Sequence, residues 1–273
     1  MDIYINVTRR IRFARERSRL IGPIRQGPVS AFLFFFLAGA GRRWRFHLGP
    51  LPFYARYRDW VALEEIALHE EYGVVGTLLK GKQTPRVLDL GAHIGLFSLF
   101  VLRGFPSAIV HSVEASRGTY DILRLNNELN RGSAWQVHWA AMWNRDGEVS
   151  FADAEMATTG HHVDMSATTA PQSRVPALSL ATLMRERVRS HLDLLKVDIE
   201  GAEEAVLCED PALLQSVGAV VAELHPERCN LQRVLDVLRE AYQFVYAIRG
   251  RSSAKPLVVA SREPLVDPTL SPL

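Results

Sequence analysis

Short apolar runs alternate with amphipathic stretches over most of the chain, and this alternation limits the possible folds more than any other feature. The runs RVLDL (86–90), SAIVHSVEAS (107–116), DLLKVDI (193–199) and AVVAELHP (219–226) are typical of strands, and each is followed by residues with helical spacing. Strands that alternate with helices form right-handed crossovers and a mainly parallel sheet. We therefore expect an α/β fold with a doubly wound sheet.

The end of the chain departs from this alternation of strands and helices. QFVYAI (243–248) and PLVVAS (256–261) are both typical of strands, and only a polar linker without helical spacing separates them. This arrangement predicts a C-terminal antiparallel hairpin, which would place one antiparallel strand at an edge of the sheet.

The composition and these patterns together predict one main domain with extensions. A chain of 273 residues with 48% hydrophobic residues can bury a full core. We expect a basic N-terminal extension with a short apolar helix (1–50), a helical lead-in (51–85), the α/β domain (86–262) and a C-terminal tail (263–273).

The N-terminal extension raises the question of a membrane. Residues 1–50 contain ten arginines against two acidic residues, and the apolar run AFLFFFLAGAG (31–41) follows them. That run is shorter than the roughly 20 residues that span a bilayer, so we expect a packing helix, with an interfacial anchor or targeting segment as the alternative. The protein is expected to be cytoplasmic, with peripheral membrane contact through residues 1–41 as a further alternative and no specific nucleic-acid partner.

Only two cysteines occur, Cys208 and Cys229, without a CxxC or Cys/His cluster. The chain therefore predicts neither a disulfide framework nor a zinc site.

The stretch VLDLGAHIG carries the first candidate site residues: Asp89, Gly91, His93 and Gly95. Glycines between a strand and a helix let the backbone approach a ligand, and the helix start offers free N–H groups. A dinucleotide fingerprint would need G-x-G-x-x-G, and His93 stands where its second glycine belongs. The turn thus favours a ligand with an adenosine but no phosphates, although His93 can instead fill space or hydrogen-bond the backbone.

Such a ligand needs an acid for its ribose and a flat apolar slot for its base. Glu114 ends the next strand, 23 residues after Gly91, and can accept hydrogen bonds from the two ribose hydroxyls. Ala141 and Met142 lie at the end of the third predicted strand, AWQVHWAAMW (134–143), where small and apolar side chains can line an adenine slot. We predict that all three contact the cofactor.

The stretch LLKVDIEGAE places Lys196, Asp198 and Glu200 at the end of the fourth strand, and Glu223 and His225 end the fifth. Ligands of open α/β sheets bind beyond the carboxyl ends of the strands, so these groups are expected to converge. Asp198, Glu200 and His225 are the candidate catalytic residues, and Asp198 can also hold the cofactor. His225 suits a general base by its ordinary pKa near 6.5, whereas Asp198 does so only if burial raises its pKa. A plain Lys196–carboxylate pair is the alternative.

A divalent metal between Asp198, Glu200 and His225 is conceivable, because carboxylate oxygens are suitable ligands. No fixed ligand spacing demands one, so we predict a site without a metal.

Together these stretches resemble the FkbM-type S-adenosylmethionine-dependent methyltransferases, over residues 57–248. KVDIEGAE is the most specific motif, and the glycine turn is shared more widely. The resemblance implies a Rossmann-like class I methyltransferase with a seven-stranded sheet and the reversed hairpin, S-adenosylmethionine as cofactor, and methyl transfer to an oxygen. The acceptor would be a hydroxyl of a natural product or other small molecule, a sugar or a glycolipid.

By position, Asp89, Gly91 and Gly95 resemble the first cofactor motif of that family, Glu114 the ribose acid, and Asp198 with Glu200 the acidic motif. One departure is the stretch Leu-Ala-Thr at 180–182, where the family often has Leu-Asp-Asp.

Two other classes of function stay open at this stage. A non-catalytic cofactor-binding or membrane-recruited scaffold protein would share the cofactor site, and a nicotinamide-dependent oxidoreductase is less favoured because of His93. The sequence makes no prediction of the oligomeric state.

Overall fold

The computed structural model describes residues 33, 34, 36, 42–68, 71–152, 162–163, 172–252 and 254–273. The expected basic leader, most of the apolar run 31–41 and most of the loop 156–174 lie outside these residues.

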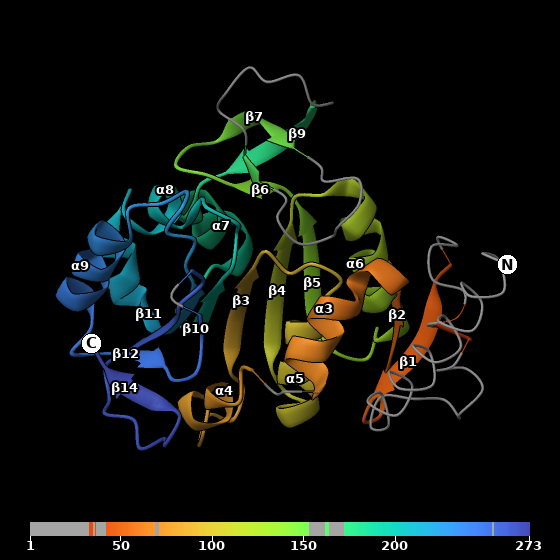
Figure 1. Ribbon diagram of the computed structural model, residues 1–273, viewed down its shortest axis with the longest axis horizontal. Coiled ribbons are helices and arrows are strands. Elements are labelled where there is room, and N and C mark those ends of the chain that lie inside the picture. Colours follow the sequence, from red (N-terminus) through yellow and green to blue (C-terminus); the bar gives the residue numbers. More distant parts are fainter. Residues whose placement is uncertain are drawn as a thin grey trace, which may run out of the picture.

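An eight-stranded sheet forms the centre of the molecule (Figure 1). In spatial order its strands are β14 (Leu270–Pro272), β12 (Phe244–Ile248), β13 (Leu257–Ser261), β11 (Val217–Glu223), β10 (Leu192–Val197), β3 (Arg86–Leu90), β4 (Ile109–Glu114) and β5 (Ala134–Trp139). The strands from β11 to β5 are parallel, which confirms the predicted doubly wound α/β fold.

The C-terminal hairpin forms as predicted, but its place in the sheet differs from the expectation. β13 lies between β11 and β12 and runs antiparallel to both, so the antiparallel strand is internal. All five residues of β13 are buried, and an edge position would leave one side of this apolar strand unpaired. The actual edge is β14, a short strand within the expected tail 263–273 that runs antiparallel to β12 and makes the sheet eight strands wide instead of the expected seven.

Helices cover both faces of the sheet, because each central strand buries alternate side chains in opposite directions. Val87 belongs to one core and Leu88 to the other. The first core is closed by α4 (Val74–Leu78), α5 (Leu96–Gly104) and α6 (Arg117–Leu129). The second core is closed by α7 (Leu180–Leu183), its π-helical continuation η4 (Met184–Val188), α8 (Glu203–Leu207), the 3-10 helix η5 (Pro211–Ser216) and α9 (Leu231–Ala241).

A second, smaller sheet lies beyond the carboxyl ends of the central strands (Figure 1). It contains β6 (Ala141–Met142), β9 (Gln172–Leu178), β7 (Gly147–Ala152) and β8 (His162–Val163). The stretch 134–143, expected as one strand, therefore splits: β5 ends at Trp139 in the central sheet, and β6 pairs with β9 instead.

The N-terminal part is a hairpin followed by short helices. β1 (Trp44–Leu48) and β2 (Leu51–Ala55) pair across the boundary expected at residue 50. The lead-in then forms the 3-10 helix η2 (Tyr57–Asp59), α3 (Trp60–Ala62), the π-helix η3 (Leu63–Leu68) and α4.

Two further expectations concern the membrane and the cysteines. Within the apolar run, Phe34 is helical, fully buried and in edge contact with Phe46. Among the described residues, no helix has the length and apolar character that a membrane span requires. Cys208 and Cys229 are both buried and free.

Candidate active site

A cavity of about 440 Å³ lies at the carboxyl edge of the central sheet. The turn after β3, the ends of β4 and β10, β6, the loop between β12 and β13, and the lead-in helices form its walls. A cavity of this size suits a small-molecule ligand. The predicted site residues that line it are Gly91, His93, Glu114, Ala141, Met142, Asp198 and Glu200, whereas Asp89, Gly95 and His225 do not.

The two glycines of the turn are required for different reasons. Gly91 has φ of +74°, and a Cβ there would lie 1.7 Å from the carbonyl oxygen of Asp198, so only glycine lets β3 and β10 end so close together. Gly95 has φ of +89°, and its Cβ would meet Leu123 and Trp135 at 2.7 Å. Gly95 thus serves the packing of α5 against its neighbours, rather than the predicted cofactor contact.

Glu114 is buried and its carboxylate braces the glycine turn. One oxygen accepts from the backbone N–H of His93 at 2.9 Å and the other from that of Ser116 at 2.8 Å. Burial raises the pKa of Glu114 to about 7, although the two N–H groups oppose this rise. The side chain still lines the cavity at the place predicted for a ribose-binding acid.

Asp89 lies beneath the cavity floor. Its carboxylate accepts from the Ser98 hydroxyl at 2.7 Å and lies 3.3 Å from the Lys196 ammonium. Lys196 also donates to the carbonyl of Gly91 at 2.8 Å and lies 3.6 Å from Asp198. Burial alone would lower the pKa of Lys196, but Asp89 and Asp198 raise it. The expected Lys196–carboxylate pair is therefore present, and it holds the turn as well as the end of β10.

His93 connects the turn to the lead-in helices. Its backbone is left-handed with φ of +52°, and its Nε2 lies 3.5 Å from the fully buried carboxylate of Asp59. Asp59 is fixed in turn by Arg56, whose guanidinium donates to both carboxylate oxygens at 2.8 and 3.0 Å. Burial would raise the pKa of Asp59, but His93 and Arg56 together lower it. The lead-in helices thus hold the glycine turn in place through the contact between Asp59 and His93.

The opposite wall is apolar. Ala140, Ala141, Met142 and Val113 line it and are buried. β6 keeps Ala141 and Met142 in place by pairing with β9. Small side chains on a rigid strand leave a flat surface, which suits an aromatic base.

The remaining wall is acidic. Asp198 and Glu200 follow β10, and Glu223 ends β11. Desolvation raises the pKa of Asp198, and desolvation together with Asp198 raises that of Glu223 to about 7. Cations from the loop between β12 and β13 partly compensate, because Arg251 pairs with Glu223 and Lys255 lies 3.5 Å from it.

His225 occupies a different position from the one expected of a general base. The ring is fully buried behind the cavity, with Nδ1 2.9 Å from Glu203 and Nε2 3.1 Å from Glu200. Burial by itself would lower the pKa of His225, but its contacts with these two carboxylates raise it to about 10. A group that is protonated at neutral pH and lies outside the cavity is not suited to take a proton from a substrate, so the predicted base role of His225 is not supported.

Several lining residues escaped the sequence reasoning. Glu65 and Glu71 come from the lead-in, and Arg251 and Lys255 from the hairpin loop. Nothing in their local spacing separates them from ordinary surface charges, since only the fold brings these segments to the sheet edge.

The arrangement can hold an adenosine-containing ligand beside a group of ionisable side chains. Glu114 and the apolar wall suit a ribose and a base, and Asp198 lies at the acidic end of the same cavity. The ligand atoms of Asp198, Glu200 and His225 also lie within 4.8 Å of one another.

Comparisons with known proteins identify the family of the chain. Residues 89–246 match the model of the methyltransferase FkbM domain. The hexuronic acid methyltransferase AglP of Haloferax volcanii is 26% identical over 201 residues, which cover 63% of this chain and 81% of that protein. The 31-O-demethyl-FK506 methyltransferase FkbM of Streptomyces tacrolimicus is 26% identical over 183 residues, which cover 56% of this chain and 70% of that protein.

Among solved structures, a SAM-dependent methyltransferase from Agrobacterium tumefaciens superposes with a TM-score of 0.47 and 14% identity, covering 82% of this chain and 72% of that one.

Proposed function

The chain belongs to the FkbM methyltransferase family, and from this premise we propose that it transfers a methyl group from S-adenosylmethionine to an oxygen of a sugar, a glycolipid or another small hydroxylated molecule. The observation that carries this proposal is the shared cavity, which joins the glycine turn, the acid at the end of β4 and Asp198.

The names of the relatives support an oxygen-rich acceptor. One is a hexuronic acid methyltransferase and the other acts on 31-O-demethyl-FK506. The acidic wall and the two cations of the hairpin loop provide hydrogen-bonding groups that suit such molecules.

The residues of the cavity fit S-adenosylmethionine. Glu114 can accept from both ribose hydroxyls, Ala141 and Met142 can flank the adenine, and the glycine turn at Gly91 forms part of the cavity wall. The positive sulfonium group of this cofactor also suits a cavity that Asp198 and Glu223 make acidic. When bound, S-adenosylmethionine supplies a methyl group that is attached to a positively charged sulfonium sulfur. The leaving group is the corresponding neutral sulfide.

The residues of the chain must then align the acceptor and remove its proton. Alignment of two bound reactants contributes up to about 7–11 kcal/mol. We assign proton removal to Asp198, because its side chain is 29% exposed beside the cavity and desolvation raises its pKa, which makes the carboxylate a stronger base. Glu223 is less suited, since Arg251 and Lys255 both pair with it. Asp198 would take the proton of the acceptor hydroxyl as that oxygen receives the methyl group.

The test uses S-adenosylmethionine with a labelled methyl group and three acceptors: a hexuronic acid, a neutral hexose and a macrocyclic alcohol. Mass spectrometry detects the labelled product. Asp198→Asn is expected to bind S-adenosylmethionine by calorimetry and to lose about 100- to 10,000-fold in transfer rate. Glu223→Gln, the control on the same wall, is expected to lose less than about tenfold by the same reasoning.

The alternative outcomes are distinct. Transfer by Asp198→Asn at the wild-type rate would overturn the role of Asp198. Binding without transfer to any acceptor would favour a non-catalytic cofactor-binding protein, and absence of cofactor binding by the folded wild type would overturn the proposed function itself.

A further inference from the structure

We propose that Asp198, Glu200 and His225 form a binding site for one divalent metal cation at the acceptor end of the cavity. This inference rests on the proposed function, because it assigns the cation a role towards the acceptor hydroxyl.

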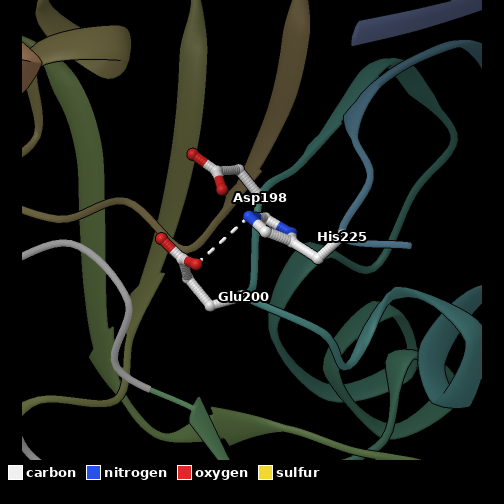
Figure 2. Close-up of side chains that lie close together, drawn as sticks. All are labelled: Asp198, Glu200 and His225. Carbon is white, nitrogen blue, oxygen red and sulfur yellow. Dashed lines mark ion pairs between the residues drawn. The ribbon is translucent and has the colours of Figure 1, made fainter. Parts of the chain in front are cut away.

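The first argument is the arrangement of the three side chains. Each offers one ligand atom, and these atoms all lie within 4.8 Å of one another. Oxygen ligands lie about 2.0–2.6 Å from Mg²⁺ or Ca²⁺, so atoms bound to opposite sides of one cation are about 4–5 Å apart. Figure 2 shows the three side chains converging from the end of β10 and the segment after β11. Asp198 and Glu200 line the cavity and His225 lies behind them, so the open side of the site faces the cavity.

The second argument is the environment of His225, which is independent of the acidic cluster. The ring is completely buried, and among the described groups its Nε2 makes no hydrogen bond of acceptable angle, although Glu200 lies 3.1 Å away. On the other side of the ring, Nδ1 lies 2.9 Å from Glu203. A histidine that donates Nδ1–H to a carboxylate directs the Nε2 lone pair at a metal, and this carboxylate–histidine pair is typical of metal sites.

The Glu203 carboxylate is itself fixed, which gives the ring a defined orientation. Its Oε1 also accepts from the backbone N–H groups of Gly201 at 3.0 Å and Ile199 at 3.3 Å. The same loop therefore holds both Glu200 and the partner of His225.

The third argument is charge. Apart from His225, the ion pairs around these residues join six carboxylates with four cations. The carboxylates belong to Glu71, Asp89, Asp198, Glu200, Glu203 and Glu223, and the cations to Lys196, Arg228, Arg251 and Lys255. A protonated His225 leaves one negative charge over, whereas a neutral His225 that binds a metal leaves two, which one divalent cation would balance.

Two cationic side chains lie close to Glu200 and would have to move away if a metal ion bound there. Lys255 lies 3.6 Å and Arg228 3.9 Å from Glu200, and their side chains are 43% and 34% exposed. Long, partly exposed side chains can withdraw into water at little cost. The competing arrangement is a protonated His225 held by its carboxylates without a metal, and the experiment distinguishes the two.

A cation at this site would assist the proposed methyl transfer. A divalent metal polarises a bound hydroxyl and lowers its pKa, which makes the acceptor oxygen a better nucleophile at neutral pH. One carboxylate oxygen of Asp198 would bind the cation, and the other would remain for the acceptor proton.

The experiment titrates the chelator-treated full chain with Mn²⁺ and measures bound metal by electron paramagnetic resonance. The expected result is one Mn²⁺ per chain, with affinity reduced about tenfold or more in Glu200→Gln and in His225→Gln. Glu204→Gln is the matched control, since Glu204 is the neighbour of Glu203 in α8 but pairs with Arg233 outside the site. It should bind Mn²⁺ like the wild type.

His225 is buried and its variant can fail to fold, so Glu200→Gln, which sits in a turn, carries the test by itself. Absence of stoichiometric Mn²⁺ binding, or binding that survives Glu200→Gln unchanged, would overturn the inference. Calorimetry with S-adenosylmethionine in the presence of chelator separates the two proposals. Cofactor binding without Mn²⁺ binding would overturn only the proposed metal site. Mn²⁺ binding without cofactor binding would overturn only the proposed methyl transfer.

Discussion

At the scale of single residues, Glu114 shows how burial changes what a carboxylate can do. Its pKa of about 7 lies well above the ordinary 4.5, because the cavity wall excludes water from it. A raised pKa means that the folded state holds the proton more tightly than the unfolded state. The contribution of Glu114 to stability is therefore full at acidic pH and is lost as the pH rises from about 4.5 to about 7.

The same shift predicts a pH-dependent affinity for S-adenosylmethionine. Ribose hydroxyls donate to the ionised carboxylate, so calorimetric affinity should rise about tenfold between about pH 6 and pH 8. Glu114→Gln should bind more weakly and lose this pH dependence, whereas Glu148→Gln, on an exposed strand position, should keep it. A wild-type affinity that stays flat over this range would contradict the role of Glu114.

Lys196 is the second residue whose effect can be isolated. It lies buried between Asp89 and Asp198 and also binds the carbonyl of Gly91. Lys196→Met leaves two carboxylates without their common cation, so the free energy of unfolding should fall by about 3–5 kcal/mol in urea denaturation. Arg174→Met, which removes a highly exposed ion pair with Glu148, should change it by less than about 1 kcal/mol. Equal effects of the two substitutions would show that burial of Lys196 has no energetic consequence.

At the scale of elements, the cavity exists because β3 and β10 end almost in contact. The approach of Gly91 to the carbonyl of Asp198 leaves no room for a Cβ, and Gly91 is therefore a structural requirement as well as part of the cavity wall. A large substitution there would not separate loss of binding from loss of folding.

A pair of glycine substitutions can measure this close approach. Gly91 and Gly81 have φ of +74° and +81°, but a Cβ at Gly81 has nothing within 4 Å. Gly81→Ala should cost only the backbone strain of a left-handed alanine, about 1–2 kcal/mol, whereas Gly91→Ala should cost clearly more because the two strand ends must separate. Thermal unfolding of both variants checks this, and similar melting temperatures would refute the steric argument.

At the scale of the whole molecule, the N-terminal hairpin is tied to the glycine turn through α6. Asn126 is fully buried: it accepts from the backbone of Tyr54 in β2, donates back to the same residue, and donates to the carbonyl of Ile94 in the turn. One amide thus joins three segments that are distant in sequence.

Removal of that amide should loosen the hairpin. Asn126→Ala leaves buried backbone groups unpaired at about 1–3 kcal/mol each, so amide hydrogens of residues 44–55 should exchange faster with solvent. Asn127→Ala, which loses one bond to the carbonyl of Trp135, should leave the exchange of this segment unchanged. Unaltered exchange in Asn126→Ala would show that the hairpin is held by other contacts.

The resemblance of short motifs allowed much of the candidate site to be predicted. Gly91, Glu114 and Asp198 line one cavity, as their positions at the ends of parallel strands predicted. The predicted base His225 and the cofactor contacts of Asp89 and Gly95 were not found in the cavity, because a side chain at a strand end can point either into the site or behind it. Arg251 and Lys255 reach the site only through the hairpin, which no local pattern connects with β10.

The sequence by itself determined the alternation of strands and helices, the turn after β3 and the C-terminal hairpin, since these depend on hydrophobic periodicity and on glycine at fixed offsets. The tertiary structure alone decided that β13 is inserted beside β11, that β14 closes the edge, and that His225 faces Glu200 and Glu203. Such outcomes depend on contacts between residues far apart in the chain. The free energies of burial and charge pairing that select them exist only once the segments have come together.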